Sequence, residues 1–382
     1  MPIFLFLFLV LMILYAYLIE YYRKAWNEMP EYDFKQNESE PFISVIIAAR
    51  NEEKNLPGLI ASLKQQAYSS TKFEIIIVDD HSTDETWPIL LSASGESDTI
   101  RAMKLADYPS PNLNMKAHKK FAIEKAIDLA RGELIVTTDA DCVFGKNWLR
   151  YIASMYVSSN AKFIAAPVQM KPGDTFLSVF QSLDFLTLQG ITGASVYRKF
   201  HTMCNGANLA YARTAFYEVG GFEGIDNIPS GDDMLLMYKI YKRYPDQVFF
   251  LKNKEAIVIT KPVETWKEFF NQRIRWASKS THYDDKKITR VLLLVYCVNI
   301  SFLILAIASF WKMTWFGLFV LFLAAKILVE FPFVNAVAIF FSERKLMKYF
   351  LIMQPFHILY TVIAGWLGKF GSYEWKGRRI KQ

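Results

Sequence analysis

Residues 42–53 read FISVIIAARNEE, and residues 73–80 read FEIIIVDD. Each stretch begins with a short apolar run rich in isoleucine and valine, which is typical of a strand buried on both faces of a parallel sheet. Two further strands and two helices are predicted nearby, the strands at 100–105 and 133–138 and the helices at 53–66 and 119–131. Buried strands that alternate with helices predict an α/β fold, a mostly parallel sheet with helices on both faces.

Acidic residues follow two of these strands directly. Asp79 and Asp80 end one strand, and Asp139 and Asp141 end another. Because the carboxyl ends of parallel strands meet at one edge of the sheet, these carboxylates should face one cleft. Crowded carboxylates need a cation, and a hard divalent ion completed by substrate phosphates meets that need. For either pair taken alone, the alternative of helix caps and solvated turn residues stays open. A run Ser82–Glu85 just beyond the first pair resembles a capping box that begins another helix.

Composition and motif searches exclude several classes of protein. The sequence contains neither G-x-G-x-x-G nor G-x-x-x-x-G-K-[ST], so dinucleotide-binding and P-loop sites are not predicted. Its three cysteines, Cys142, Cys204 and Cys297, have neither a disulfide framework nor metal-type spacing. The net charge of +7 does not favour nucleic acid as a partner, because much of the basic excess lies next to apolar segments, where anionic lipid headgroups attract it.

Four segments are long and apolar enough to cross a bilayer: 1–18, 291–311, 313–341 and 349–367. The first has neither the basic start nor the cleavage site of a signal peptide, so residues 1–22 are predicted to remain as an anchor. The basic pair of Arg23 and Lys24 behind it predicts that the following domain faces the cytoplasm.

The carboxyl-terminal end presents a conflict of topology. Four complete spans would return the basic tail, 369–382, to the outside, although its lysines and arginines favour the cytoplasm. The sequence therefore predicts two to three complete spans within 291–368, and Pro355 makes the last segment the candidate for a re-entrant one. Lys326 and Glu330, four residues apart inside the third segment, are predicted to pair with each other.

Several motifs stand in a fixed order along the chain. They are Ala49–Glu53, Val78–Asp84, the D-x-D of Asp139 and Asp141, Asn205–Asn208, Ser230–Asp233, and the Q-x-x-R-W of Gln272–Trp276. The ordered set, which ends just ahead of the C-terminal apolar segments, resembles the family-2 glycosyltransferases of the GT-A fold over nearly the whole chain. A D-x-D alone is common, whereas this ordered set is specific.

The resemblance implies a nucleotide-sugar donor and a divalent metal. By this resemblance, Asp80 accepts a hydrogen bond from the nucleotide base, usually uracil. Asp139 then lies near the ribose and diphosphate, and Asp141 ligates Mn²⁺ or Mg²⁺. The other donor-binding positions that it implies are Ala49, Glu52, Lys120, Gln272 and Trp276.

The resemblance also assigns catalytic roles to Asp233 and Arg275. Asp233 would be the general base that deprotonates an acceptor hydroxyl, and Arg275 would join the metal in stabilising charge on the departing diphosphate. One carboxylate base without a carboxylate nucleophile fits a single displacement with inversion. The sequence departs from the family at two places. Asp232 stands where the family often has glutamate, and His118–Lys120 stands where it has Gly-Lys, so either lysine could approach the phosphates.

The Q-x-x-R-W segment is predicted to form an interfacial helix within 263–285. On a helix, Gln272, Arg275 and Trp276 share one face. The basic side of the same helix is predicted to consist of Lys267, Arg273 and Lys279. The alternative is an aromatic core helix with a solvated basic face.

These observations predict an integral membrane enzyme of the plasma or inner membrane with a cytoplasmic catalytic domain at 41–262. It would be an inverting, metal-dependent hexosyltransferase that moves a sugar from a nucleotide diphosphate, usually a UDP-sugar, to a lipid or lipid-linked acceptor. A processive polysaccharide synthase and an inactive membrane scaffold remain as alternatives. Four spans are few to enclose an export channel, which argues against a processive synthase. Every expected acidic position is filled, which argues against an inactive scaffold.

Overall fold

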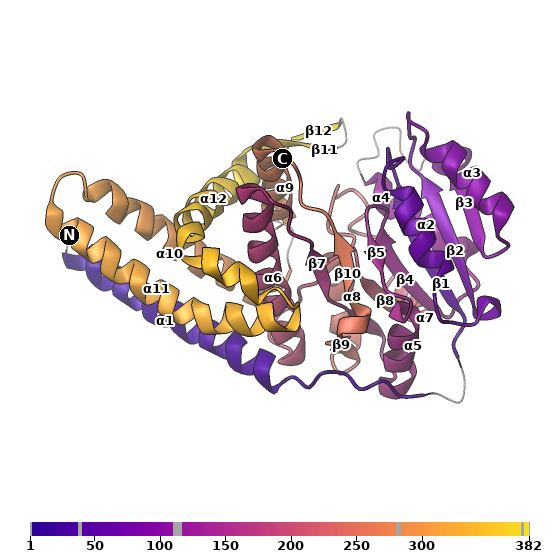
Figure 1. Cartoon of the computed structure of the whole chain (residues 1–382), viewed down its shortest axis with the longest axis horizontal. Helices are drawn as coiled ribbons and strands as arrows, with labels where there is room; N and C mark the ends of the chain where they lie inside the picture. Colours follow the sequence, from indigo (N-terminus) through magenta and orange to yellow (C-terminus); the bar gives the residue numbers. More distant parts are fainter. Residues whose placement is uncertain (1, 37–39, 110–116, 280–283, 376–377, 382) are drawn as a thin grey trace. The chain divides into compact units, whose positions relative to one another are not determined.

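The computed structural model describes residues 2–36, 40–109, 117–279, 284–375 and 378–381 (Figure 1). They form two compact units. The helical unit comprises Met1–Met29, Pro172–His201 and Pro262–Gln382, and the sheet unit comprises Pro30–Lys171 and Thr202–Lys261. Residues 172–201, which lie inside the predicted catalytic stretch of 41–262, therefore belong to the helical unit.

The sheet unit is built on a seven-stranded sheet with the order β3-β2-β1-β4-β8-β6-β9. Its strands are β1 (Ile43–Ala49), β2 (Phe73–Asp79), β3 (Ile100–Lys104), β4 (Leu134–Asp139), β6 (Phe163–Ala165), β8 (Leu209–Ala212) and β9 (Val248–Phe250). The four strands predicted from the sequence are confirmed as β1 to β4, and they pair in parallel. β8 runs antiparallel to its neighbours β4 and β6, so the sheet is mostly parallel with one reversed strand.

Helices and a smaller sheet complete this unit. The smaller sheet has the order β5-β10-β7, with β5 (Val143–Phe144), β7 (Val168–Met170) and β10 (Val258–Thr260). The helices are α2 (Leu56–Lys64), α3 (Thr86–Glu96), α4 (His118–Leu129), α5 (Trp148–Ser159), α7 (Arg213–Glu218) and α8 (Met234–Arg243), with 3-10 turns η1 (Ser70–Lys72), η2 (Leu105–Asp107) and η3 (Lys254–Ala256). Every residue of β2 is buried, as expected when both faces of a parallel sheet are covered.

The predicted capping box at Ser82–Glu85 is wrong. α3 begins at Thr86, and the side chain of Glu85 makes no capping hydrogen bond. Instead, Asp84 Oδ1 accepts a hydrogen bond from Thr86 N at 3.1 Å, and Asp84 Oδ2 accepts one from Glu53 N at 3.2 Å. Asp84 thus joins the start of α3 to the loop after β1. Partners so far apart in the chain are not visible to a local pattern.

The helical unit contains the apolar segments. Its elements are α1 (Pro2–Glu28), α6 (Phe176–Tyr197), α9 (Trp266–Ser278), α10 (Lys286–Ala308), α11 (Met313–Phe340), η5 (Arg344–Tyr349), α12 (Phe350–Phe370), β11 (Ser372–Trp375) and β12 (Arg378–Lys381). Within the described residues, four stretches are long and apolar enough to cross a membrane, namely Ile3–Glu28, Lys286–Ala308, Met313–Phe340 and Arg344–Phe370. They correspond to the four segments predicted from hydropathy.

Three of the long helices, α1, α10 and α11, lie side by side (Figure 1). The ring of Phe8 on α1 meets Phe302 of α10 edge to face, with centroids 5.1 Å apart, and lies 4.5 Å from Phe322 of α11. On α11, Lys326 Nζ lies 2.6 Å from Glu330 Oε1, which confirms the predicted pair.

The last helix, α12, ends against α9. At Gly368 an added Cβ would come within 2.6 Å of Ala277 Cβ, so the close approach of the two helices requires glycine here. The hairpin β11-β12 follows, and Tyr373 is buried in a cluster with Ile274 and Ala364. The C-terminal hairpin therefore packs on the Q-x-x-R-W helix. Three residues of the predicted basic tail, Lys376, Gly377 and Gln382, lie outside the described residues.

Candidate active site

The acidic strand ends meet at one edge of the sheet, as predicted. Ala49 pairs with Asp79 across β1 and β2, and Ala48 pairs with Asp139 across β1 and β4. The chain leaves β2 with the amide of Asp80 donating a hydrogen bond to Ala49 O at 2.8 Å. Parallel pairing therefore brings both acidic pairs to the edge where α/β sheets bind ligands.

The loops after β1 and β2 are interlocked. Asn51 N donates to Ser82 Oγ at 3.0 Å, and Thr83 N donates to Asn51 Oδ1 at 2.9 Å. Asn51 and His81 both have positive φ angles, 53° and 57°. Such backbone is held only where its surroundings enforce it, and it concentrates at functional sites. The interlocked loops give Asp80 a rigid support.

Asp80 is almost completely buried at this edge, with 3% of its surface exposed. Two histidines approach it: His81 Nδ1 lies 3.0 Å and His118 Nδ1 3.4 Å from Asp80 Oδ1. Among the described residues, these three form the one group of acidic and histidine side chains whose possible ligand atoms all lie within 4.8 Å of one another. From the sequence, neither histidine was predicted to belong to the site. Their signal is positional, since His81 follows Asp80 directly and His118 begins α4.

A lysine joins two of the carboxylates. Lys119 Nζ lies 2.7 Å from Asp139 Oδ1 and 3.0 Å from Asp232 Oδ2. Burial alone would lower the pKa of Lys119, but the carboxylates of Asp139 and Asp232 outweigh it and hold the pKa well above the ordinary lysine value. Asp232 lies beyond β8 in the chain, so Lys119 joins this later segment to the end of β4.

The neighbouring Lys120 is engaged elsewhere. Its side chain is buried, and its amine donates to the backbone carbonyls of Ile225, Ile228 and Ser230 at 2.7 to 2.9 Å. Lys120 therefore fastens the loop that leads to Asp232. From the sequence, Lys120 was assigned to donor binding, although either lysine could approach the phosphates. The contacts of Lys120 with backbone carbonyls favour Lys119 for that role.

Asp233 caps helix α8. Its Oδ1 accepts a hydrogen bond from Met234 N at 2.7 Å, and its Oδ2 accepts one from Gly206 N at 3.2 Å. Gly231, two residues earlier, has a φ of +81°, which glycine adopts without strain. A Cβ at Gly206 would lie 3.4 Å from both Lys119 Nζ and Asp232 Oδ2, so the loop 205–208 approaches the lysine-carboxylate chain closely.

Asp141 stands at the start of the short connection to β5. Its Oδ2 accepts a hydrogen bond from Thr260 Oγ1 at 3.3 Å. Carboxylate oxygens at a strand end are suitable ligands for Mg²⁺ or Mn²⁺, and a long contact to a hydroxyl can be exchanged for one to a cation. The D-x-D therefore has donors of the kind that such an ion requires.

Cys142, next to Asp141, is buried, with 1% of its surface exposed. Burial raises the pKa of its thiol, and the carboxylates of Asp141 and Asp139 raise it further. The buried thiol packs as a small side chain, and its Sγ donates to Asp141 Oδ1 at 3.5 Å.

Glu52 and Ala49 have local structural roles at this edge. Glu52 N donates to Thr86 Oγ1 at 2.7 Å, and Glu52 Oε2 accepts from Asn55 Nδ2 at 2.8 Å. These contacts hold the turn between β1 and α2. Ala49 is a small residue at the strand end beside Asp80.

The remaining predicted residues lie on α9 in the helical unit. The helix begins with a capping box between Thr265 and Glu268. Gln272, Arg275 and Trp276 are each partly exposed. Arg273, which was predicted to lie on a basic outer face, is 4% exposed and ion-paired, so that prediction is wrong. The helix turns one arginine inward and the other outward.

Two family descriptions match this chain. "Glycosyl transferase family 2" matches residues 44–220, and "Glycosyl transferase family group 2" matches residues 134–367, more than half of the chain. The chain belongs to glycosyltransferase family 2. In this glycosyltransferase the sheet unit has the mixed, mostly parallel α/β architecture expected of the GT-A fold, and long apolar helices stand at both ends of the chain.

Among curated relatives, the glycosyltransferase is 26% identical to "Probable glycosyltransferase YdaM" of Bacillus subtilis over 62% of its own length and 54% of the relative. It is 29% identical to a beta-monoglucosyldiacylglycerol synthase of a Nostoc species over 30% of its length and 24% of the relative. An undecaprenyl-phosphate 4-deoxy-4-formamido-L-arabinose transferase of Shewanella sediminis is 33% identical over 28% of this chain and 30% of the relative. The matches span about half of these relatives or less. The relatives include transferases that act on lipids.

The fold is also seen in a solved structure. Mannosyltransferase PcManGT from Pyrobaculum calidifontis, determined in complex with GDP-Man and Mn²⁺, aligns with a TM-score of 0.56 and 17% identity over 94% of this chain and 97% of that one. At this level of identity the similarity concerns the fold.

Proposed function

We propose that this glycosyltransferase transfers a hexosyl group from a UDP-sugar to a lipid or lipid-linked acceptor at the cytoplasmic face of the membrane, with inversion. The observation that carries the proposal is the set of carboxylates at the sheet edge. Asp80 lies within 3.4 Å of two histidine nitrogens, Asp139 and Asp232 share Lys119, and Asp233 is oriented by two backbone amides. Each carboxylate has a different environment, as a site with separate donor and acceptor functions needs.

Asp80 is proposed to bind the nucleotide base. A carboxylate fixed by rigid loops can accept a hydrogen bond from the N–H of uracil in a defined direction, and a base without a donor at that place would lose this bond. Ala49 and Glu52, at the strand end and in the turn beside it, are proposed to complete the donor-binding site.

Asp141 is proposed to ligate the divalent cation, and Asp139 to lie near the ribose and diphosphate of the donor. Bound there, Mn²⁺ or Mg²⁺ would supply positive charge to the donor diphosphate. Lys119 rather than Lys120 is proposed to approach the phosphates, because it lies among the carboxylates whereas the Lys120 amine is bound to backbone carbonyls. On α9, the partly exposed Gln272, Arg275 and Trp276 are proposed to stabilise the leaving diphosphate.

Asp233 is proposed to act as the general base. The acceptor hydroxyl would transfer its proton to the carboxylate while its oxygen bonds to the anomeric carbon and the bond to the diphosphate oxygen breaks. The amides of Gly206 and Met234 orient the carboxylate for that purpose. With an acceptor that is already an anion, such as a lipid phosphate, no proton needs to be removed.

The C-terminal hairpin supports a cytoplasmic tail. Glu374 N donates to Asn271 Oδ1 at 3.3 Å, so the tail packs on α9. Only Pro262–Thr265 separates the sheet unit from α9, which is too short to cross a bilayer. We therefore propose that the tail and the sheet unit share one face of the membrane, and that α12 does not complete a fourth span.

The test is a nucleotide-release assay with purified enzyme, a panel of sugar nucleotides and membrane lipid extract. Release coupled to single addition onto a lipid supports the proposal. A ladder of products would support a processive synthase instead, and no release with any donor would support an inactive scaffold.

A further inference from the structure

Arg273 is the buried arginine of the Q-x-x-R-W helix. Its guanidinium carbon lies 4.2 Å from the ring centroid of Trp276 and 5.0 Å from that of Phe269. A guanidinium stacks well on such rings, but a buried charge also needs a counterion. That counterion is Asp184 on α6, whose Oδ2 lies 2.9 Å from Arg273 Nη2.

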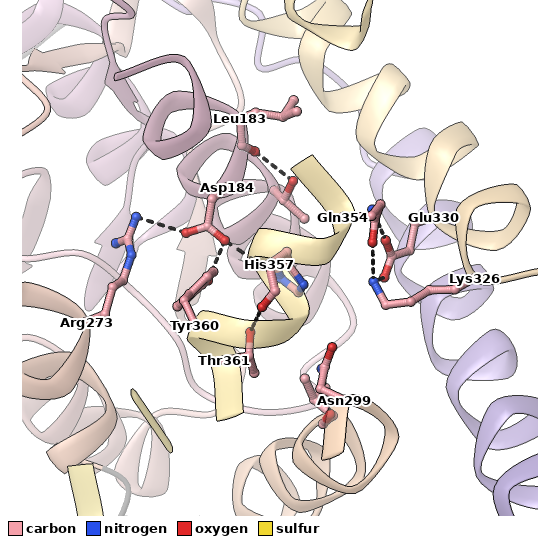
Figure 2. A network of polar contacts seen from close by, with 12 residues as sticks. Leu183, Asp184, Arg273, Asn299, Lys326, Glu330, Gln354, His357, Tyr360 and Thr361 are labelled. Atoms are coloured by element: carbon pink, nitrogen blue, oxygen red, sulfur yellow. Dashed lines mark hydrogen bonds and ion pairs between the residues drawn. The ribbon is translucent and has the colours of Figure 1, made fainter. Parts of the chain in front are cut away.

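Asp184 connects three helices. Tyr360 of α12 donates its hydroxyl hydrogen to Asp184 Oδ1 at 2.5 Å, and His357 Nε2 lies 3.8 Å from the same oxygen. Figure 2 shows Arg273, Tyr360 and His357 converging on Asp184 from two sides. The side chains of Arg273 and Asp184 are 3% and 4% exposed. The pair is thus enclosed, and neither partner can move to water without breaking it.

This contact determines which way α9 faces. Successive residues of a helix are turned by about 100°. With Arg273 held toward Asp184, Trp276 and Gln272 are turned about 60° and about 100° to one side of it, and Arg275 lies on nearly the opposite side of the helix. A rotation of α9 that released Arg273 would carry Gln272 and Arg275 away from their present direction. Because the pair is buried, such a rotation would leave a charge without a partner, which is strongly unfavourable.

We propose that Asp184 is a positioning residue for the glycosyl transfer reaction. Through Arg273 it sets the rotation of α9 and so the direction of Arg275 and Gln272. The inference rests on the proposed function of those two residues in stabilising the leaving diphosphate. Asp184 itself touches neither donor nor acceptor in this account, and it acts only through the helix.

The same unit contains a matched control. Lys326 Nζ and Gln354 Nε2 both contact Glu330, at 2.6 and 2.8 Å, and Lys326 also donates to Gln354 at 2.6 Å. Tyr15 of α1 donates to Glu330 as well. Figure 2 shows this second cluster on α11 and α12. This second cluster is also polar and buried, but its four side chains lie on α1, α11 and α12 and not on α9.

The experiment compares three variants of the full-length protein in detergent or nanodiscs: Asp184→Asn, the apolar pair Asp184→Leu with Arg273→Met, and Glu330→Gln. Melting temperature, kcat and donor KM are measured for each. Replacing both members of a buried ion pair with apolar residues often preserves stability. We expect the apolar pair to melt near the wild type but to lose roughly tenfold or more in kcat, since small displacements of catalytic groups have effects of that size. Glu330→Gln should lower the melting temperature and leave kcat of the folded enzyme within about twofold.

A second readout does not depend on activity. Gln272→Cys is introduced into each background, and its labelling rate with a water-soluble maleimide is measured against the parent without that cysteine. Changed labelling with the Asp184 variants, and unchanged labelling with Glu330→Gln, is the expected result. Wild-type turnover of the apolar pair, or unchanged labelling in the Asp184 variants, would overturn the inference. If the wild type itself releases no nucleotide, the proposed function fails, while the labelling still decides whether Asp184 orients α9.

Discussion

Asp139 at the edge of the sheet and two carboxylates of the helical unit differ in their exposure to water. At the edge of the sheet, Asp139 leaves 37% of its side chain exposed, and its partner is the ammonium of Lys119. In the helical unit, Asp184 and Glu330 leave 4% and 9% exposed and are each enclosed by several fixed partners. Water and ions can reach Asp139, whereas Asp184 and Glu330 are shielded from them; Asp80 and Asp233 of the sheet unit are buried as well, with 3% and 7% exposed.

Exposure determines what each carboxylate can do. A group in contact with water can exchange one partner for another at low cost, because solvent compensates the charge during the exchange. A buried carboxylate that loses its partner remains as an unpaired charge in a medium of low polarity. The sheet edge is therefore suited to binding a cation and a diphosphate, and the helical unit uses charge to fix the orientation of helices.

The largest effect is expected at Asp141, where the comparison predicts an exchangeable ligand. EDTA should abolish transfer, Mn²⁺ or Mg²⁺ should restore it, and Asp141→Asn should lose activity while the protein still inserts and folds. Turnover is measured by nucleotide release, and folding by the melting temperature. Glu330→Gln serves as control, because EDTA sensitivity should be unchanged in it. Full activity of the wild type in EDTA would remove the metal from the proposal.

Asp233→Asn should lower transfer to a hydroxyl acceptor by about 10² to 10⁴ and leave sugar-nucleotide binding nearly intact, because it removes the base and keeps the shape. The comparison variant Asp80→Ala should weaken donor binding first. Donor binding and turnover are measured separately for both. Normal turnover of Asp233→Asn with a hydroxyl acceptor would place the base elsewhere. If activity is kept only with a lipid phosphate, the acceptor needs no base.

The variants Lys119→Met and Lys120→Met compare two lysines with different partners. Lys119 is ion-paired with carboxylates of the site, and Lys120 is buried among backbone carbonyls. Lys119→Met should reduce turnover with little change in melting temperature. Lys120→Met should lower the melting temperature, because three backbone carbonyls lose their donor, each worth about 1 to 3 kcal/mol when left unsatisfied. Since the pKa of Lys119 is raised, its ammonium stays charged at neutral and mildly alkaline pH and adds no alkaline limb to the rate profile there. A lower melting temperature for Lys119→Met than for Lys120→Met would reverse the assignment.

The smallest effect on activity is expected at the tail. Ser372→Cys should leave turnover unchanged, and thiol labelling in sealed vesicles should place the tail on the same side of the membrane as the sheet unit. A cysteine at Lys312, between α10 and α11, provides the opposite-side control. Labelling of position 372 from the side of position 312 would restore four complete spans.

The parallel strands of the sheet unit could be predicted from local sequence. Runs such as Val45–Ile47 and Ile75–Val78 are apolar on both faces, and only a parallel sheet covered by helices buries them. Once those strands are parallel, Asp80 and Asp139 must reach one edge, so the acidic edge was predictable too. The apolar segments were predictable for a similar reason, because length and hydropathy alone make a segment fit to cross a bilayer.

Side-chain partners were not predictable, because they come from distant parts of the chain. His118 lies 38 residues after Asp80 in the chain, yet its Nδ1 is 3.4 Å from the Asp80 carboxylate. Arg273 is a charged residue of the kind usually found on a surface, and its burial depends on the ion pair with Asp184 on another helix. Lys119 and Lys120 are adjacent and chemically identical, and only the positions of Asp232 and of the carbonyls before it separate their roles.

The sequence by itself determined the α/β sheet, its acidic edge and the apolar helices, since hydrophobic periodicity and strand direction are local properties. The tertiary structure alone decided which lysine meets the carboxylates, which arginine of α9 is buried, and that the C-terminal hairpin packs on that helix. The physical reason is that the stability of a charge depends on its burial and on the partners within a few ångströms, and both are properties of the folded chain.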